Sequence, residues 1–499
     1  MSLDALAGPP LSDEVRAGVR LAYGLLMTLT VLQLGPVGRW FLTTATHGGY
    51  LDPGPWRDRL LGPVGRRLLW VLWLASSCSL TLDLLTPLAG TFNFVCCYYF
   101  FIATRWTGIL RGMGAPGFMS CWLGAIVLLF EIGRHADPTG ELVLATTLAA
   151  RVDFAVIMLC AGTYKAFAGY RSNDGMELGM VNPWWGYGWL WPRVQRTRPT
   201  LVLFRVFNSM AWLVQISAGL LMLVPSLRWV GASLIAISFA GIALQIRLGF
   251  LCEMVILSAL LCAGDGTPLG QLVALASPPV TPPTTVVPLP HWVPTALTWA
   301  ALVYVAALPL AKLGLYLNFY AVRRLPGALQ PLLERYTNLT GLIVWRVFTV
   351  DVVGFFVDID VVGPDGRASP YARPGHLEAS KGFRYLHVGE FVCLASLFTA
   401  LKYHTSNTQH FESRLVRYAR TVPCPPGSRV RFLYRLIRKH PDRFEHEPVV
   451  EFLVDPLTGA VQERALDPTV SIRAPADRSP VHEGARPGTY APAAAPNLT

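Results

Sequence analysis

Residues 151–191 read RVDFAVIMLCAGTYKAFAGYRSNDGMELGMVNPWWGYGWLW, and this stretch determines how the rest of the chain is interpreted. The first half is a long apolar segment with one lysine, Lys165, near its end. The second half is rich in Gly, Asn and Trp. A lysine inside an apolar helix is costly to place in a membrane, so it is a candidate functional residue. The stretch predicts a membrane helix followed by an aromatic loop.

The composition of the whole chain also indicates a membrane protein. Of its 499 residues, 53% are hydrophobic and 15% are charged, with a mean hydropathy of +0.42. Charged residues make up about a quarter of an ordinary soluble protein. Acidic residues stand near the N-terminus where a signal peptide would be basic, so we expect the first span to direct insertion. The composition predicts a multi-pass protein of the cell membrane.

Apolar segments of about the length needed to cross a bilayer recur along the chain. We expect about nine spans, at 19–34, 68–90, 92–104, 117–133, 142–168, 201–224, 229–246, 248–263 and 292–317. The basic loops 36–67, 105–116, 169–200 and 318 onward alternate with these spans and are expected to be cytoplasmic, which leaves the proline-rich loop 277–290 outside. The net charge of +11 fits these loops, so no nucleic-acid partner is expected.

The composition changes after the last span. Residues 345–367 and 429–466 alternate apolar and polar residues, which predicts strands and turns, and 384–420 is expected to be helical. The predicted fold is therefore mainly α: a transmembrane helix bundle (1–318), a small soluble α+β domain (319–471) and a disordered Pro/Ala-rich tail (472–499).

Lys165 has two interpretations. Desolvation disfavours a charged ammonium group, and a neutral lysine is a competent general base or nucleophile. Alternatively, Lys165 extends to the membrane surface from the helix end, or forms an ion pair with Glu177 or Asp153. Asp153 could instead pair with Arg151 at the interface. Both interpretations of Lys165 stay open on periodicity alone.

Two other polar residues in apolar segments are candidate catalytic groups. Asp83 has no basic residue near it in sequence and is either functional or a hydrogen-bonded structural carboxyl. Asn93, with Tyr98 and Tyr99, is expected either to line a pocket for a planar lipophilic ligand or to belong to an aromatic belt at the membrane surface. Such a pocket would bind a lipophilic small molecule from the bilayer.

Three further residues are candidates for substrate binding. Trp184 and Trp185 belong to the Trp-rich loop, which predicts an anchor at the membrane interface or the roof of a cavity. Glu253 is a candidate partner for Lys165 or Arg247. The nine cysteines show no metal-binding spacing, so no metal site is expected, and no phosphate- or dinucleotide-binding glycine pattern identifies a cofactor.

Three segments resemble one family. GTYKAFAGY (162–170), with Gly175 and the Trp-rich loop, is similar to the membrane domain shared by vitamin K-dependent gamma-carboxylases and their bacterial relatives, the horizontally transferred transmembrane (HTTM) domain. FNFVCCYYFF (92–101) resembles the Asn-containing, Tyr-rich helix of that family. The region from WRVFTVDV (345–352) to RYART (417–421) resembles the β-rich region of the bacterial members.

The resemblance implies a role for Lys165. Lys165 matches the base that deprotonates vitamin K hydroquinone in the animal carboxylase, and Asn93 matches the family's asparagine. The histidine that follows this asparagine in the carboxylases is replaced by Phe94, and the chain has no room for the large C-terminal lobe of the animal enzymes. The resemblance therefore implies a membrane-bound, lyase- or carboxylase-like enzyme that acts on a quinone- or isoprenoid-type substrate, with a reduced quinone as candidate cofactor.

Two alternatives to this enzyme remain. An isoprenoid (terpene-type) cyclase would use Asp83 as acid initiator and aromatic side chains to stabilise cations, although no DDxxD or DxDD motif is present. A non-catalytic membrane scaffold or partner protein would use Lys165 structurally. A transporter is the weaker idea, because no internal repeat is apparent. The oligomeric state is not predicted.

Overall fold

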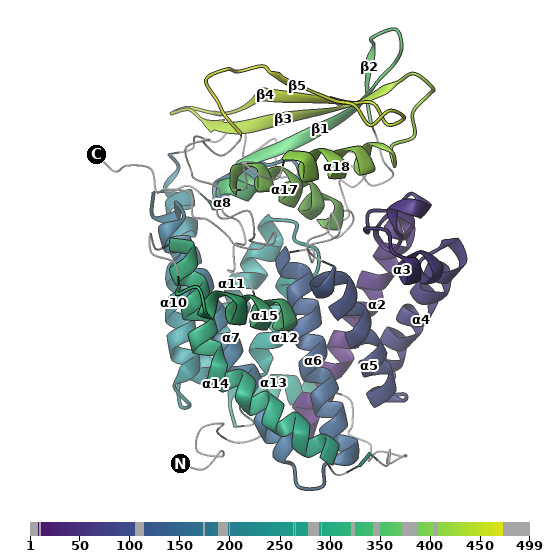
Figure 1. Ribbon diagram of the computed structural model, residues 1–499. Helices are drawn as coiled ribbons and strands as arrows, with labels where there is room; N and C mark the ends of the chain where they lie inside the picture. The colour runs from purple at the N-terminus through teal and green to yellow at the C-terminus, as the bar shows by residue number, and fades with distance from the viewer. Residues whose placement is uncertain are drawn as a thin grey trace.

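A helix bundle and a five-stranded antiparallel sheet make up the chain, with two helices, α17 and α18, between them (Figure 1). The computed structural model describes residues 8, 11–104, 114–172, 175–187, 198, 200–262, 264, 266–277, 289–290, 292–320, 325–342, 350–371, 388–403 and 408–472. Most of the predicted proline-rich loop and nearly all of the predicted disordered tail therefore lie outside the described residues, as do Trp189 and Trp191 of the Trp-rich loop.

Helices make up most of the described chain, and the strands are confined to its C-terminal part. The N-terminal part contains α2 (Asp13–Phe41), η1 (Ala45–His47), α3 (Pro55–Leu60), α4 (Pro63–Thr81), α5 (Thr86–Cys97), η2 (Tyr98–Ala103), α6 (Gly114–Ala136), α7 (Glu141–Phe167), η4 (Tyr170–Ser172) and α8 (Met176–Val181). Next come α10 (Val202–Leu223), α11 (Arg228–Gln245), α12 (Leu251–Leu260), α13 (Pro268–Ala276), α14 (Trp292–Tyr320), α15 (Leu329–Thr340) and α16 (Val350–Val353). The C-terminal part contains β1 (Phe355–Val362), β2 (Ala368–Pro370), α17 (Val388–Tyr403), α18 (Thr408–Ala419), β3 (Arg429–Lys439), β4 (Phe444–Val454) and β5 (Val461–Ala465).

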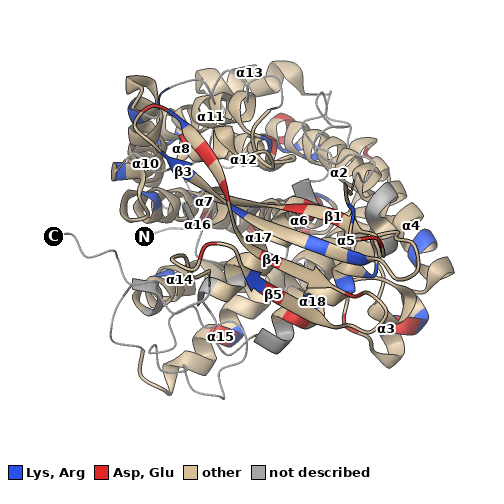
Figure 2. Cartoon of the chain, turned by 90° about the horizontal axis from the view of Figure 1, so that it is seen from above, with Lys and Arg blue, Asp and Glu red and all other residues tan. Residues whose placement is uncertain are grey.

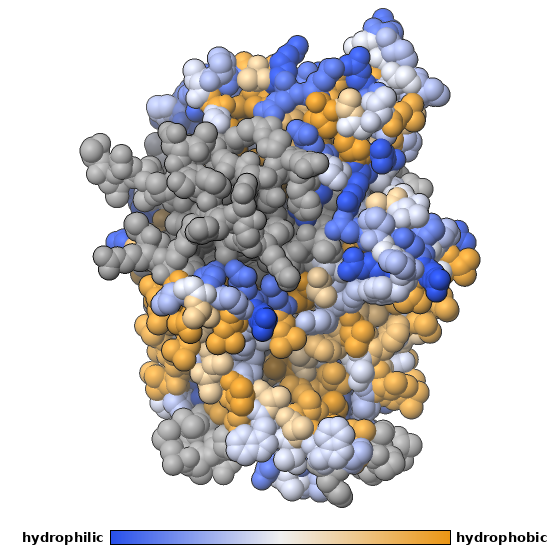
Figure 3. Space-filling view, in the orientation of Figure 1, coloured by the Kyte–Doolittle hydropathy of each residue, from blue (hydrophilic) through white to orange (hydrophobic). Residues whose placement is uncertain are grey.

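Seven helical segments in the described part of the chain are long and apolar enough to cross a membrane. They are 13–35, 86–103, 116–136, 141–167, 202–223, 228–245 and 292–317. On the face shown in Figure 3, hydrophobic residues gather over the bundle, below an upper part in which hydrophilic and hydrophobic residues are mixed. The fold is therefore mainly helical and consistent with a multi-pass membrane protein, as the composition predicted.

The expected spans 68–90 and 92–104 are divided differently from the prediction. Helix α4 ends at Thr81, and Asp83 and Leu85 then adopt left-handed backbone conformations, with φ of 58° and 48°. Helix α5 begins at Thr86 with Pro87 in its first turn, where a proline needs no backbone hydrogen bond. Asp83 therefore lies in a turn between two helices and not inside a span.

The expected eighth span, 248–263, is not a full-length membrane helix. Its helix α12 has ten residues, about half the length that crosses a bilayer. Most of its side chains, among them Leu251, Met254 and Val255, are buried in the protein. Helix α12 is therefore a core helix, which its continuous hydrophobicity alone could not distinguish from a span.

The basic connections expected to share one side of the membrane lie at the same end of the bundle as the sheet, as far as they are described. Arg417 of α18 pairs with Asp52, which follows α2, and Lys439 of β3 pairs with Glu177 of α8. The expected grouping of loops 36–67 and 169–200 is thus confirmed for their described parts. That this side is cytoplasmic remains a prediction.

The sheet has the strand order β2-β1-β3-β4-β5 with antiparallel neighbours throughout. The two faces differ because side chains alternate along a strand. The inner face packs aromatic residues such as Phe432 and Phe452 toward α17 and α18, whereas the outer face carries ion pairs such as Arg431–Asp360 (2.7 Å). Figure 2 shows basic (blue) and acidic (red) positions interspersed along the strands. The strands expected in 429–466 are confirmed, whereas 350–353 forms a helical turn and β1 begins only at Phe355.

The stability of the sheet is expected to depend on pH because of one histidine, His446 of β4. Burial, and secondarily the neighbouring Arg435 guanidinium, lowers the pKa of His446 from 6.5 to about 4, while Phe356 contacts its ring edge to face. The unfolded chain therefore binds a proton more readily than the folded one between these pH values. We expect stability to be constant above about pH 6.5 and to fall as the pH decreases toward 4. Unfolding in detergent across this range measures the effect. His446→Gln should flatten the profile, and an unchanged slope would contradict the assignment to His446.

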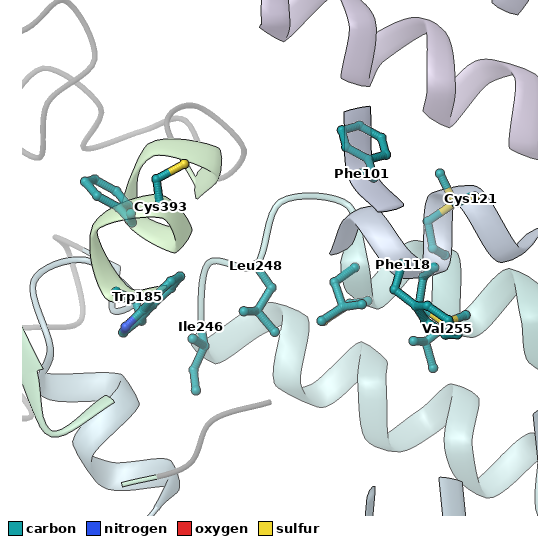
Figure 4. Packing of buried hydrophobic residues seen from close by; sticks show 14 of the residues in the cluster. Phe101, Phe118, Cys121, Trp185, Ile246, Leu248, Val255 and Cys393 are labelled. Atoms are coloured by element: carbon teal, nitrogen blue, oxygen red, sulfur yellow. The ribbon is translucent and has the colours of Figure 1, made fainter. Parts of the chain in front are cut away.

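The sheet and the helices share one continuous hydrophobic cluster. Trp184 stacks on Phe391 of α17 with ring centroids 5.8 Å apart and contacts Phe355 of β1 at 5.9 Å. Trp185 lies between α17, which carries Cys393, and the segment with Ile246 (Figure 4). The sheet is therefore held on the bundle by apolar packing as well as by ion pairs.

Asn182 fixes this junction through its side-chain amide. Its Nδ2 donates to the carbonyls of Val353 (2.8 Å) and Phe355 (2.7 Å), and its Oδ1 accepts from the backbone N–H of Trp184 (2.8 Å). The residue is fully buried, so no water replaces these bonds when they are lost. We expect Asn182→Leu to lower the free energy of unfolding by about 3 kcal/mol.

Thermal unfolding and limited proteolysis of the detergent-solubilised full chain measure this loss. The exposed Thr91 on α5, whose hydroxyl donates within its own helix to the Pro87 carbonyl, provides a control: Thr91→Leu should change stability by less than about 0.5 kcal/mol. Equal effects at the two positions would show that Asn182 has no special role in joining the sheet to the bundle.

Candidate functional site

Lys165 lies in the last turn of α7 with its side chain directed into the protein. Only 3% of the residue is exposed. Its Nζ donates to Oε1 of Gln215 at 2.8 Å and lies 5.9 Å from the centre of the Tyr170 ring. Cys252 of α12 is near enough to interact electrostatically with it. Extension of Lys165 to the membrane surface is therefore contradicted by the geometry.

The two carboxylates considered as partners of Lys165 are engaged elsewhere. Glu177 accepts from Lys439 at 2.7 Å, and Asp153 accepts from Trp122 Nε1 at 2.8 Å and from the Tyr304 hydroxyl. In the described part of the chain no carboxylate lies within ion-pair distance of the Lys165 ammonium group. A buried lysine without a counter-ion is unusual in a membrane helix and indicates a functional site.

Gln215 is placed beside Lys165 by a close approach of α7 and α10. A Cβ at Gly162 would lie 2.8 Å from the backbone nitrogen of Ile216, and one at Gly219 would lie 2.8 Å from that of Leu159. Only glycine permits this separation at both positions. Gln215 is fully buried, and its Nε2 has no acceptor among the described residues.

A second group of buried polar residues, Glu177 and Asn208, lies close to Tyr170. The Tyr170 ring packs directly on Gly175, where a Cβ would be 2.7 Å from ring carbons. Burial, and then the nearby Glu177 carboxylate, raises the pKa of Tyr170 well above its ordinary value. Glu177 also accepts from Asn208 Nδ2 at 2.7 Å, while Met176 N–H donates to Asn208 Oδ1 at 2.9 Å. Lys439 of β3 donates to Glu177 at 2.7 Å, so this group connects the lysine site to the sheet.

Gln215, Asn208 and Tyr170 were not among the site residues predicted from sequence. One signal was present, because Asn208 and Gln215 are seven residues, or about two turns, apart and therefore share a face of an otherwise apolar helix. Nothing in the sequence indicated that this face meets α7 at Lys165.

Asn93, predicted as a catalytic or pocket residue, has its hydrogen-bonding groups occupied by the protein. Its Oδ1 accepts from Trp73 Nε1 at 2.9 Å and from the Ser77 hydroxyl at 3.3 Å. Its Nδ2 donates to the Tyr23 hydroxyl at 2.8 Å, which in turn donates to the Ser120 carbonyl. Asn93 therefore joins its own helix, α5, to α2, α4 and α6.

Tyr98 and Tyr99 lie in the π-helical segment η2. The Tyr99 ring contacts Trp56 edge to face with centroids 5.7 Å apart, and Tyr98 contacts Phe94 at 5.9 Å. The Arg57 guanidinium lies near enough to the Tyr99 hydroxyl to interact with it electrostatically. These partners differ from those of Lys165, so the structure does not bring the two tyrosines to the lysine.

Asp83 belongs to a partly buried ionic network at the opposite end of the bundle from the sheet. Arg20 pairs with Asp83 at 3.1 Å and with Glu131 at 3.4 Å, and Arg134 pairs with Asp83 at 2.9 Å. The Thr86 hydroxyl donates to Glu131 at 2.6 Å. The absence of a basic neighbour in sequence was therefore misleading, because Asp83 has two in space, and the interpretation as a structural carboxyl fits the geometry.

The Trp-rich loop is internal in its described part. Trp184 and Trp185 are 0% and 3% exposed, so neither is an anchor in the membrane interface. Arg247 holds them by donating to the carbonyls of Pro183 (2.7 Å) and Trp184 (3.3 Å), and burial lowers its pKa to about 10. Glu253, in the first turn of α12, does not pair with Lys165.

A second buried lysine, Lys312 of α14, lies near Asp153 and interacts with it electrostatically. Tyr304 on the same helix also donates to Asp153, so α14 is held against α7 by polar contacts. Arg151 instead donates to the Leu261 carbonyl at 3.0 Å. The expected interfacial pair of Arg151 and Asp153 is therefore wrong.

One group among the described residues has donors close enough together for a metal ion. His440, Glu445 and Glu447 at the β3–β4 turn place one ligand atom each within 4.8 Å of one another. Arg438 pairs with Glu447 at 2.6 Å and Arg443 with Glu445 at 3.3 Å. A cation would have to displace both arginines, so these residues fit a surface ion-pair network better than a metal centre.

Comparison with models of protein families, with curated proteins and with solved structures yields no match to this chain. The function of the lysine site is therefore inferred from its contacts, burial and hydrogen bonds.

Proposed function

We propose that the chain is a multi-pass enzyme of the cell membrane in which Lys165 acts as base or proton donor on a lipophilic quinone- or isoprenoid-type substrate. The observation that supports this proposal is the burial of the Lys165 ammonium group without a carboxylate partner among the described residues. Structural lysines in membrane helices usually pair or reach the interface, and Lys165 does neither.

The chemistry of the site favours a ligand with an oxygen acceptor. An ammonium group offers three donors, of which Lys165 uses one toward the described residues, to Gln215. The Nε2 of Gln215 adds a buried donor without an acceptor among the described residues. The oxygen of a quinone, a quinol or its anion would accept from both groups. In a dry environment such a bond would also favour proton transfer between the oxygen and Nζ.

The similarity of GTYKAFAGY to the carboxylase membrane domain adds a candidate substrate, a reduced quinone. The burial and hydrogen bonding of Lys165 do not depend on this similarity. Protein glutamate carboxylation is not proposed, because Phe94 stands where the carboxylases have a histidine after the asparagine.

Mass spectrometry of lipophilic molecules that co-purify with the full chain tests the proposal. The wild-type protein should retain a quinone- or isoprenoid-type molecule that Lys165→Met loses. Thr163→Val on the same helix is the matched control, because that hydroxyl bonds only to its own helix at Leu159. Retention of the same molecule by Lys165→Met, or its absence from the wild type after feeding prenylquinones, would overturn the proposal.

The alternative is a non-catalytic membrane scaffold. It is favoured by one observation: the contacts of Asn93, Asp83 and Trp184 are all structural. Lys165 would then serve to join α7 to α10. The cyclase alternative is less suited to the geometry, because an acid initiator must deliver a proton, whereas Asp83 forms ion pairs with two guanidinium groups.

A further inference from the structure

A cleft of about 360 Å³ lies at the seam between the bundle and the C-terminal part of the chain. One wall is formed by the end of α2, the turn after it and the start of α4. The other wall is the turn that follows α18. The lining includes Trp40, His47, Pro63, Arg66, Arg420 and Thr421. None of these residues belongs to the lysine site.

The lining of the cleft is positively charged. Arg66 and Arg420 come from parts of the chain more than 350 residues apart, and no carboxylate is among the lining residues. On the connection between α2 and α4, Asp52 pairs with Arg417 and Asp58 accepts from Thr44. Arg420 donates its Nε to the Pro456 carbonyl at 3.0 Å, which orients its guanidinium group.

The amino end of α4 adds to this positive potential. Pro63 occupies the first turn of this 19-residue helix, and Gly62 precedes it without a side chain that caps the helix. The unpaired N–H groups at a helix start favour a negatively charged ligand. His47 lies beside the same turn, with Nε2 3.0 Å from the Asp58 carbonyl.

The cleft lies next to an exposed apolar face of α4. Immediately after Pro63, one face of α4 exposes large apolar side chains at Val64 (80%), Leu68 (58%), Val71 (51%) and Leu72 (45%). This i, i+4, i+7, i+8 spacing forms a single stripe along the helix. The cleft is therefore at the level expected for lipid headgroups.

From this arrangement we propose that the cleft binds the phosphate group of an anionic phospholipid. Guanidinium groups bind phosphate through paired, charge-assisted hydrogen bonds. The apolar stripe on α4 receives the acyl chains, which makes a lipid a better fit than a free phosphate compound. The Trp40 ring lines the same cleft and supplies an apolar contact for the glycerol region.

Native mass spectrometry of the detergent-solubilised full chain, titrated with phosphatidylglycerol or phosphatidylcholine, tests this site. We expect preferential binding of phosphatidylglycerol, and about tenfold weaker binding for Arg66→Gln and for Arg420→Gln, since a hydrogen bond to a charged group contributes that much. Arg66→Lys should retain more affinity than Arg66→Gln. Size-exclusion profiles and thermal unfolding confirm that each variant is folded.

Arg67→Gln is the matched control, since it removes the same charge from the next residue of α4, which does not line the cleft. An equal loss in Arg67→Gln would overturn the proposal in favour of general surface charge. Equal affinity for phosphatidylcholine, or no loss in the double variant Arg66→Gln/Arg420→Gln, would also overturn it. Inorganic phosphate is the other source of this group, and its binding through the same arginines without any lipid preference would overturn the assignment to a lipid.

Discussion

Replacing Lys165 by methionine is expected to abolish ligand binding and turnover while leaving the free energy of unfolding unchanged or higher. The substitution loses the hydrogen bond to Gln215, a contribution of about 1.5–3 kcal/mol. It also removes a buried charge that has no carboxylate partner in the described part of the chain, and with it a desolvation penalty of several kcal/mol. The two effects are of similar size and opposite sign.

Unfolding in detergent, measured together with the amount of co-purified lipophile, separates the proposed enzyme from the scaffold. If Lys165 mainly joins two helices, Lys165→Met should destabilise the protein and leave any bound molecule in place. Gln215→Leu serves as a comparison, because it removes the only hydrogen-bond acceptor of the ammonium group among the described residues and should destabilise by about 2 kcal/mol. The double variant Lys165→Met/Gln215→Leu should recover most of that loss. Additive losses in this cycle would contradict the energetic argument.

Arg20→Met is expected to lower the free energy of unfolding by about 3 kcal/mol, because Asp83 and Glu131 lose one of their two guanidinium partners and keep only Arg134. The Arg20 and Glu131 side chains are each 4% exposed, so water cannot replace the lost contacts. The substitution also leaves the Leu80 carbonyl without its 2.7 Å donor. Unfolding of the full chain in detergent measures the loss.

Arg16 on the same helix provides the control for Arg20. It pairs with Asp13, whose side chain is 60% exposed, so Arg16→Met should lower stability by less than about 1 kcal/mol. Glu131→Gln combined with Arg20→Met should cost less than the sum of the two single changes. Similar losses for Arg16→Met and Arg20→Met would mean that the network around Asp83 is not a special source of stability.

The elements that could be predicted from sequence were those with a local signal. Seven of the nine expected spans correspond to membrane-length apolar helices in the described structure, whereas 68–90 and 248–263 do not. The strands of 429–466 and the described part of the helical region 384–420 are also confirmed. The break near Asp83 was missed by the predicted span 68–90, although Pro87 in the first turn of the next helix was a local signal for it. The length of α12 was not readable, since a buried helix and a lipid-exposed one are equally apolar.

The partners of the candidate residues depended on contacts between distant segments. Lys165 was singled out by its apolar surroundings, yet its partner Gln215 lies 50 residues away on a helix that approaches through Gly162 and Gly219. Asp83 was selected for lacking a basic neighbour, and helix packing supplies Arg20 and Arg134.

By itself, the sequence determined that the chain forms a mainly helical, membrane-type bundle followed by a region with strands, because hydrophobic length and alternation act within a few residues of one another. Only the tertiary structure decided that Lys165 points inward, since snorkelling and burial both suit a lysine near a helix end. The tertiary structure also decided that Glu177 pairs with Lys439, 262 residues away, and so connects the sheet to the lysine site. Such pairings depend on how helices and strands pack, which local sequence does not encode.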